Sequence, residues 1–370
     1  MKLTTLRRTY RAVRSVLTER SRRVWAASEA IALGHGGIGL VERATGISRS
    51  TISRGIRELD AGDAASPDRT HHFTDQFRLT LGGRLFSQKF QNASDLEGFF
   101  VLLLNGGLTQ SLSGSQRSTG FNPKASVTWN PTEDLMFYAL ASKGYRFGGA
   151  NLSVLPGVDP TYGSDSLWNY EAGMRADLLD RKLLLDLTGF YIDWSDIQLS
   201  RQFSGVNFID NAGVARIYGL EASATLRPAE GLSLNSNLTY LNAKLSEDYD
   251  SNTADPTNPI IPAGQQLPGA SKWQISNILS YDIPVGSLNS LFVLSHRYIS
   301  RAPSNIEAST SQGGYHVFDA RVGVRKDRYG VTLFMDNIGD SRGVTASIND
   351  PFNQFIVRPQ TIGVTFDVRM

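Results

Sequence analysis

The fold of this chain is decided by the stretch 218–227, which reads Tyr218-Gly-Leu-Glu-Ala-Ser-Ala-Thr-Leu-Arg227. Every second side chain is apolar, starting with Tyr218, and from Glu221 on the side chains between them are polar or charged. Alternation with a period of two residues is typical of a β-strand whose two faces meet different surroundings. The stretch 232–240 repeats the pattern after a short connection, so both stretches are predicted to be strands.

The same alternation recurs along most of the chain on either side of this stretch. About a dozen segments show it, and many are longer than the ~5–6 residues usual in soluble sheets. They suit the roughly 9–11 residues with which a tilted strand crosses a bilayer. The predicted strands are 76–90, 121–130, 134–147, 167–178, 182–199, 218–227, 232–240, 271–283, 288–300, 316–325, 329–338 and 361–369.

The connections between these segments alternate between short and long. The turns 227–231 and 326–330 are tight, whereas 246–270 and 300–314 are long and polar. Short turns at one end and long loops at the other are typical of outer-membrane barrels. The sequence therefore predicts a mainly β fold, a partial antiparallel transmembrane β-barrel of about a dozen strands. A soluble β-sandwich, which also alternates in polarity, is the alternative; the long strands, the one-sided loops and a hydrophobic content of 41% favour the barrel.

Aromatic residues gather near the ends of the predicted strands. Such positions are typical of the aromatic girdles that mark the two water interfaces of a membrane barrel, although aromatic residues are common in strands of every kind. The residues concerned are Trp129, Tyr138, Tyr145, Trp168, Tyr170, Trp194, Tyr218, Tyr240, Trp273, Tyr281 and Tyr298.

The first seventy residues have a different character. They hold 13 Lys+Arg and 7 Asp+Glu, a net charge of +6, whereas the whole chain carries +2, so residues 71–370 carry −4. A helical period is visible from Leu6 to about Ile31, and Gly34 to Gly37 interrupts it. We expect a small all-α module at 1–60, a linker at 61–75 that is rich in small residues, and the β-barrel part at 76–370.

Two further helices are predicted within this module. The first covers 38–45, Gly46 can adopt the positive φ of a helix end, and Ser48 is a suitable N-cap for a second helix over 49–59. Two helices joined by a glycine turn form a helix-turn-helix, which places its second helix in the major groove of DNA. An ordinary basic surface helix is the alternative. The candidate DNA-binding residues are Arg49, Ser50, Ser53, Arg54 and Arg57.

Several classes of function find no support in the sequence. The chain has no cysteine and no run of about 18 apolar residues, which argues against disulfides, cysteine-bound metal and a transmembrane helix. Arginines throughout 1–23 argue against a secretory signal peptide and hence against export. His35, His296 and His316 are isolated in the sequence, and no hydrolase, metalloprotease or P-loop motif occurs. We therefore expect no enzyme activity, no cofactor and no metal site.

Charged residues on the polar face of the predicted strands are candidates for lining a path for a solute. Ion pairs that fill the interior of the barrel are the alternative for most of them. These residues are Glu171, Arg175, Glu221, Arg227, Arg321 and Arg325.

The β part resembles the C-terminal portion of TonB-dependent outer-membrane receptors. The resemblance rests on motifs that occur in the family's order: 134–149, Trp168 to Leu178, 187–198, Asp336-Asn-Ile-Gly-Asp340 and Arg358 to Phe366. It implies energised uptake of a scarce ligand such as a siderophore or vitamin, with outer-membrane lipid and the TonB system as partners. Family barrels close about 22 strands around a plug, and the plug and the TonB contact motif are not found here. The resemblance also implies that the last strand carries the signal for barrel assembly. The apolar residues expected to form this signal are Ile362, Val364, Phe366 and Val368.

Residues 15–60 resemble the DNA-binding start of an insertion-sequence transposase. The matching motifs are 19–37, Ala44 to Ile52 and Gly55 to Leu59. The resemblance implies binding to transposon ends, but the acidic catalytic domain does not follow. Three functions remain open: an outer-membrane receptor fragment, which we favour because it covers most of the chain; a DNA-binding fragment with a passenger β tail; and a soluble β-rich binding protein. A fusion created by an insertion element in a receptor gene explains both resemblances.

Overall fold

The structure, a computed structural model, describes residues 10, 23, 25–27, 29–30, 37–60, 69–72, 74–99, 101–102, 109–151, 158–203, 206–250, 260–347 and 353–369. The chain forms two compact units, Met1–Asp68 and Arg69–Met370. Within the described residues, no helix is long and apolar enough to cross a membrane.

The first unit contains the two helices predicted near its end, α3 (Gly37–Thr45) and α4 (Arg49–Asp60). Gly46 adopts a φ of 76°, and its amide donates to the carbonyl oxygen of Glu42 over 2.8 Å. The hydroxyl of Ser48 accepts the amide of Thr51 at 3.3 Å, so Ser48 is the N-cap of α4. A small core packs the two helices against neighbouring residues; it consists of Ala26, Ala30, Val41 and Ile52. Most of the first predicted helix lies outside the described residues.

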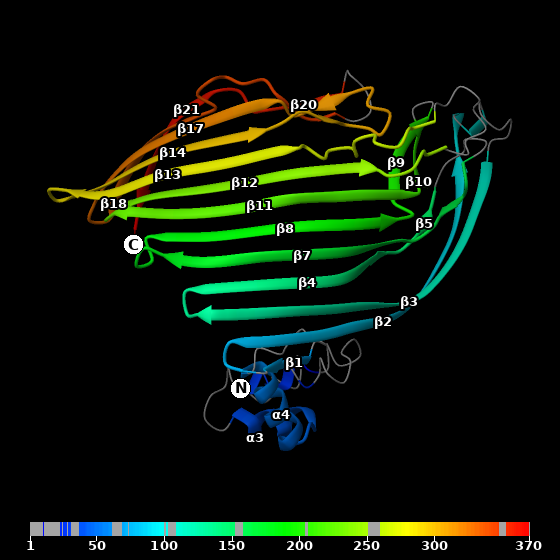
Figure 1. The fold of residues 1–370 in the computed structure, drawn as a ribbon, viewed down its shortest axis with the longest axis horizontal. Helices are drawn as coiled ribbons and strands as arrows, with labels where there is room; N and C mark the ends of the chain where they lie inside the picture. The colour runs from blue at the N-terminus through cyan, green and yellow to red at the C-terminus, as the bar shows by residue number, and fades with distance from the viewer. Residues whose placement is uncertain are drawn as a thin grey trace. The chain divides into compact units, whose positions relative to one another are not determined.

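The second unit is dominated by one antiparallel sheet of thirteen strands in the order β1-β2-β3-β4-β7-β8-β11-β12-β13-β14-β17-β18-β21 (Figure 1). Twelve of these strands are the twelve predicted ones. Their bounds are β2 (Phe77–Glu97), β3 (Thr109–Thr132), β4 (Leu135–Arg146), β7 (Asp165–Leu178), β8 (Leu183–Ser195), β11 (Val214–Ala229), β12 (Leu232–Leu245), β13 (Trp273–Val285), β14 (Leu288–Ile299), β17 (Tyr315–Lys326), β18 (Tyr329–Asp336) and β21 (Thr361–Val368).

The thirteenth strand, β1 (Arg69–His72), lies inside the segment that the sequence predicts to be a linker. It pairs with β2 from Arg78 to Leu81. Four small antiparallel pairs, which the sequence did not reveal, lie outside the large sheet. They are β5 (Gly149–Ala150) with β6 (Thr161–Tyr162), β9 (Gln198–Phe203) with β10 (Val206–Asn211), β15 (Ala302–Pro303) with β16 (Ser311–Gln312), and β19 (Val344–Ser347) with β20 (Gln354–Ile356).

The connections confirm the predicted difference between the two ends of the sheet. At one end, strands are joined by turns of two to four residues, such as 133–134, 179–182 and 327–328. At the other end the connections 147–164, 196–213 and others are long and carry the small strand pairs, so that β5, β9 and β10 lie together there (Figure 1). We call these the short-turn end and the long-loop end.

Glycines allow aromatic rings to lie flat across neighbouring strands. Gly173 faces Tyr138 and Gly219 faces Phe190 in the strand register. A Cβ atom at Gly173 would lie 2.6 Å from Cε1 of Tyr138, and one at Gly219 would lie 2.6 Å from Cζ of Phe190. No side chain larger than hydrogen fits beneath these rings. These contacts hold strand pairs in register, because a shift by one residue would bring a side chain under each ring.

Candidate functional site

The strand register divides the sheet into two faces of opposite character. In the centre of the sheet, Leu220 lies between Gly189 and Tyr240, and the next residue, Glu221, lies between Thr188 and Thr239. Because successive side chains of a strand point to opposite sides, one face carries Leu220 and its apolar neighbours. The other face carries Glu221 and its polar neighbours. We call these the apolar face and the polar face.

Large hydrophobic side chains are accessible across the whole apolar face. Leu220 is 38% exposed, Val322 51% and Leu333 53%. Soluble proteins rarely expose contiguous apolar area on such a scale, so hydrocarbon is the medium that fits this face. Further members of the face are Leu81, Leu187, Leu234, Phe292, Leu294, Val324, Ile362, Val364, Phe366 and Val368.

Aromatic side chains flank this apolar band. Towards the long-loop end, Trp168 and Tyr170 lie with ring centroids 6.0 Å apart, and Tyr240 and Trp273 lie 4.7 Å apart. Towards the short-turn end, the ring of Trp129 stacks on that of Phe137. The side chains of Tyr281 and Tyr329 are exposed at the same end. The strand register places all four residues on the apolar face. This arrangement fits two interfacial girdles.

Two of the residues predicted for the girdles belong to the polar face, which corrects the prediction. Tyr138 donates or accepts a 2.6 Å hydrogen bond with the hydroxyl of Thr188. Trp194 packs under the long loops, with the guanidinium carbon of Arg146 5.3 Å from its ring centroid. The sequence placed them wrongly because closeness to a strand end does not specify a face.

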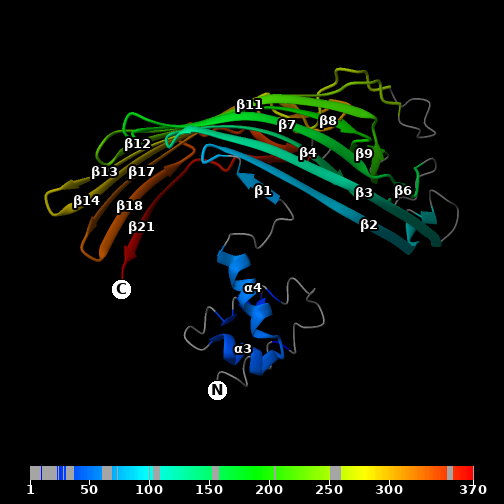
Figure 2. The same ribbon diagram turned by 60° about the horizontal axis from the view of Figure 1, so that its bottom comes forward.

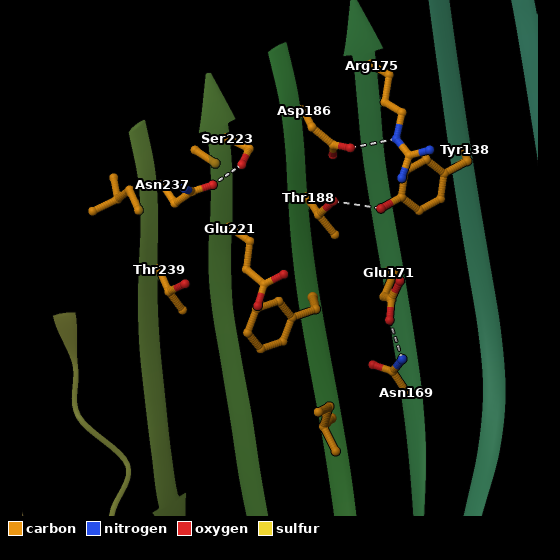
Figure 3. A pocket seen from close by; sticks show the side chains of 14 residues that line it. Tyr138, Asn169, Glu171, Arg175, Asp186, Thr188, Glu221, Ser223, Asn237 and Thr239 are labelled. Atoms are coloured by element: carbon orange, nitrogen blue, oxygen red, sulfur yellow. Dashed lines mark hydrogen bonds and ion pairs between the residues drawn. The ribbon is translucent and has the colours of Figure 1, made fainter. Parts of the chain in front are cut away.

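A polar hollow of about 610 Å³ lies on the polar face, across β4, β7, β8, β11 and β12 (Figure 3). Arg175 Nε and Asp186 Oδ2 are 2.5 Å apart, and the amide of Asn169 donates to Glu171 at 2.6 Å. The hydroxyl of Ser223 donates to the amide oxygen of Asn237. The lining also contains Tyr138, Thr188, Phe190, Ile192, Glu221, Ala222, Leu238 and Thr239.

The hollow presents more acceptors than donors. Two carboxylates, Glu171 and Glu221, project into it in addition to the ion pair of Arg175 with Asp186 (Figure 3). Hydroxyl and amide groups supply the remaining polar atoms. Such a lining suits the passage or retention of a polar solute that carries hydroxyl or amide donors or a bound cation.

The structure separates the six charged residues that the sequence predicts for this face. Glu171, Arg175 and Glu221 line the hollow. The other three lie elsewhere on the face. Arg321 pairs with Asp336 at 3.7 Å, Arg325 pairs with Asp367, and Arg227 lines a separate hollow at the turn between β11 and β12.

The long loops form a packed layer that sequence reasoning missed. Arg201 of β9 is 4% exposed, and its guanidinium contacts Oε1 of Glu307 at 3.1 Å. The same guanidinium lies 5.4 Å from the ring centroid of Tyr249, whose hydroxyl donates to Asp210. Two causes raise the pKa of Tyr249 above its ordinary value. Burial of the ring is the larger one, and the hydrogen bond to the Asp210 carboxylate is the second.

An apolar cluster of buried side chains forms the core of this layer. Its members come from β11 and β12 and from the connections 196–213, 246–272 and 300–314, which are far apart in the chain. Asn151 adds a polar tie, because its amide group both donates to and accepts from the backbone of Ile209 at 2.8 Å. The layer is therefore built into the end of the sheet. The cluster consists of Ile197, Leu199, Ala212, Ala215, Ile217, Ala243, Leu245, Tyr249, Ile261, Leu267 and Ile306.

The four residues predicted as a barrel-assembly signal lie on the apolar side of β21. Their exposed fractions run from 52% for Val364 to 77% for Phe366. The start of β21 is tied down by Asn337, whose amide donates to the carbonyls of Ser341 and Arg358 at 3.0 and 2.8 Å. A role of Ile362, Val364, Phe366 and Val368 in assembly remains a prediction.

The candidate DNA-binding residues all lie on α4. Arg49 is exposed and its Nε is 2.7 Å from Glu42 of α3. Ser50 is exposed and shares a 3.0 Å hydrogen bond with Ser48, and Ser53 is half-buried. The side chains of Arg54 and Arg57 lie outside the described part of the structure.

Two histidines that look isolated in the sequence are neighbours in the sheet, which corrects that observation. Nε2 of His296 lies 3.0 Å from Nδ1 of His316, on the apolar face of β14 and β17. Strand pairing brings together residues that are twenty positions apart. Among the described residues no three His, Cys, Asp or Glu gather as metal ligands.

The comparisons with known proteins agree with this geometry. A family described as "TonB dependent receptor-like, beta-barrel" matches residues 68–338. The pesticin receptor of Yersinia pestis is 26% identical over 285 residues, which are 75% of this chain and 39% of that protein. The metal-pseudopaline receptor CntO of Pseudomonas aeruginosa is 26% identical over 212 residues, 54% of this chain and 29% of that protein.

The fold is that of a solved receptor. The crystal structure of the ferric yersiniabactin uptake receptor FyuA from Yersinia pestis aligns with a TM-score of 0.66 and 19% identity, over 81% of this chain and 44% of FyuA. The chain thus spans less than half the length of each of these relatives. Since the family match covers most of the chain, from 68 to 338, this protein belongs to the TonB-dependent receptor-like β-barrel family.

Proposed function

We propose that this chain forms part of the wall of an outer-membrane receptor that takes up a scarce small ligand, such as a siderophore or a metal complex. The family is one of outer-membrane barrels, and the names of the relatives are those of receptors rather than enzymes. The observation that carries the proposal is the sheet itself, whose apolar face suits lipid and whose opposite face holds the hollow around Glu171 and Glu221.

The ligand is inferred from chemistry that the relatives share. Their printed names refer to metal-pseudopaline, pesticin and ferric yersiniabactin. Carboxylates, hydroxyls and amides in the hollow can contact the polar rim of a metal chelate, and the packed loop layer lies at the entrance end. Energy for uptake in this family comes through TonB, which we propose as a partner of the complete receptor.

A binding titration tests the proposal. The full chain in detergent micelles is titrated with ferric catecholate, hydroxamate and phenolate chelates, and with the same chelators without iron, while tryptophan fluorescence is recorded. Saturable binding of at least one ferric chelate, weakened in Glu171→Gln/Glu221→Gln but retained in Arg321→Gln, supports the proposal. Absence of saturable binding for every chelate, in a chain that retains its β circular dichroism, contradicts it.

We propose a separate DNA-binding role for the first unit, as a fragment of transposase type. The capped α4 helix, with Arg49 and Ser50 exposed at its start, favours it. A mobility-shift titration of the full chain at increasing salt tests the proposal, because each phosphate contact adds to the salt dependence. Binding that is lost in Arg54→Ala/Arg57→Ala but kept in Arg321→Ala is the expected result, and equal binding by both variants contradicts the proposal.

A further inference from the structure

One row of paired residues crosses five strands of the sheet near its long-loop end. The strands β4, β7, β8, β11 and β12 lie side by side in the sheet (Figure 2). Residues that lie opposite one another in successive strand pairs form a row, and all members of a row point to the same face. We call this one the cationic row. Its members are Lys143, Trp168, Asp193, Arg216 and Lys244.

The cationic row lies at the rim of the apolar face. Arg216 precedes Leu220 by four residues on β11, and every second residue of a strand shares a face. Three side chains of the row are cations and one, Asp193, is a carboxylate, so three positive charges minus one leave a net charge of +2. In the described strands neither neighbouring row adds a carboxylate. Tyrosines lie on one side, and Ser166, Ser195 and Val214 lie on the other.

Two further rows of side chains indicate the depth of the cationic row. The next row towards the short-turn end is rich in tyrosine, and in it the amide of Asn242 donates to the hydroxyl of Tyr218 at 2.6 Å. The row after that contains Gly189 and Leu220 and belongs to the apolar face. Because tyrosine rings gather at the headgroup level of a bilayer, the cationic row lies just outside the hydrocarbon, at the depth of lipid phosphates. The tyrosine-rich row consists of Ala141, Tyr170, Tyr191, Tyr218 and Asn242.

The cations of this row have too few anions to neutralise them. Arg216 and Lys244 lie directly opposite each other, a position in which like charges destabilise a strand pair. Nε of Arg216 is 3.8 Å from Oδ1 of Asp193, and both side chains are well exposed, so this ion pair is weak. The ion pairs among the described residues include neither Lys143 nor Lys244. An anion bound between Arg216 and Lys244 would remove their mutual repulsion.

We propose that Arg216 and Lys244 bind the phosphate of a membrane lipid whose acyl chains lie along the apolar face. An arginine fork and a lysine ammonium are both good donors to phosphate oxygens. A lipid fits better than a free anion, because the tyrosine-rich row and the apolar face continue directly from the cations. Lys143 lies three strands from Arg216, about 14 Å at the usual strand spacing, and attracts a second phosphate. The proposal rests on the membrane location of the proposed function but not on its ligand.

Native mass spectrometry of the full chain in detergent micelles tests the site. The chain is mixed with phosphatidic acid, or with diacylglycerol of the same acyl chains, which lacks the phosphate. Bound phosphatidic acid should exceed bound diacylglycerol severalfold. Arg216→Gln/Lys244→Gln should lower the affinity for phosphatidic acid by about tenfold or more, whereas Arg216→Lys/Lys244→Arg, which keeps both charges, should retain it.

Arg297→Gln/Arg321→Gln is the matched control, because it removes the same charge from the polar face. An equal loss of affinity in this control would show general attraction by charge and overturn the proposal. Full retention of phosphatidic acid by Arg216→Gln/Lys244→Gln would also overturn it. Displacement of the lipid by an equal concentration of inorganic phosphate would show a site for the free anion instead. None of these side chains lines the hollow, so failure here is distinct from failure of the ligand titration.

Discussion

At the scale of single residues, glycines beneath aromatic rings limit what the sheet can accept. At Gly219 an added Cβ would lie 2.2 Å from the carbonyl oxygen of Tyr240 and 2.6 Å from the ring of Phe190. The backbone oxygen cannot move without breaking strand pairing. By contrast, a Cβ at Gly189 would lie 3.9 Å from the carbonyl oxygen of Ala172, which is ordinary van der Waals contact.

We therefore expect Gly219→Ala to destabilise the folded chain by ~1–3 kcal/mol, the usual cost of overpacking. Gly189→Ala should cost much less and is the matched control. Unfolding in urea, followed by tryptophan fluorescence in detergent micelles, measures both. Equal midpoints for the two variants would show that the ring of Phe190 does not lie against Gly219 as described.

We expect Tyr249 to make the loop layer sensitive to alkaline pH. Burial and the bond to Asp210 raise its pKa in the folded state above the ordinary value of 10.0. The unfolded chain ionises this tyrosine first, so the layer's stability is present below about pH 10 and falls as pH rises above that value. Tyr249→Phe should lose this part of the pH dependence.

Protease cleavage of the loops between pH 8 and 11 measures this effect. The unaltered chain should become more sensitive towards the alkaline end, and the loops of Tyr249→Phe should change less over the same range. Tyr162→Phe, a tyrosine with no hydrogen bond to a carboxylate among the described contacts, serves as the control. Identical pH profiles for all three chains would contradict this role of Tyr249.

At the scale of elements, the two sides of β21 should respond oppositely to charge. Val364 is 52% exposed on the apolar face, and its neighbour Thr365 lies on the polar face. An arginine facing hydrocarbon at mid-membrane costs about 2–4 kcal/mol in a barrel, whereas one facing the lumen costs little. Val364→Arg should therefore fold poorly into lipid vesicles, and Thr365→Arg should fold nearly as well as the unaltered chain.

Heat-modifiable migration in detergent gels gives the folded fraction for each variant. A similar folded fraction for Val364→Arg and Thr365→Arg would mean that the apolar face does not meet lipid at β21. Folding yields measured in short-chain and long-chain lipids separate an effect on insertion from one on the sheet itself, since the thickness of the bilayer alters only the former.

Alternation predicted the strands well because each strand separates an apolar face of the sheet from a polar one. The twelve predicted segments are the twelve long strands, and the Ser48 cap and Gly46 turn located α3 and α4. The far ends of β2 and β3 were missed, because 109–120 is polar on both sides and has no period. Strands β9 and β10 have only six residues each, too few for a period to stand out in the sequence.

Contacts between distant residues could not be predicted from one sequence. Arg201 and Glu307 are 106 positions apart, and nothing local marks either as part of the buried layer. His296 and His316 meet only through the register of β14 and β17. The sequence correctly assigned Glu171, Arg175 and Glu221 to the polar face of the strands. The ion pair of Arg175 with Asp186 could not be predicted without the strand register.

At the scale of the whole molecule, the second unit is a sheet of the TonB-dependent receptor-like β-barrel family, with an apolar face, a polar hollow and a packed loop layer. The first unit has its own small core around Val41 and Ile52. Membership of the family rests on the second unit, since the match begins at residue 68. Any role of the first unit in binding DNA is separate from that membership.

The orientation of the two faces is the central claim, and quenching of single tryptophans by brominated lipid tests it most directly. The full chain, with four of its five tryptophans replaced by Phe, is reconstituted in vesicles to leave either Trp168 of the apolar face or Trp194 of the polar face. Strong quenching of Trp168 and little quenching of Trp194 is the predicted result. Equal quenching of both, or quenching of Trp194 alone, would contradict the assignment of the faces.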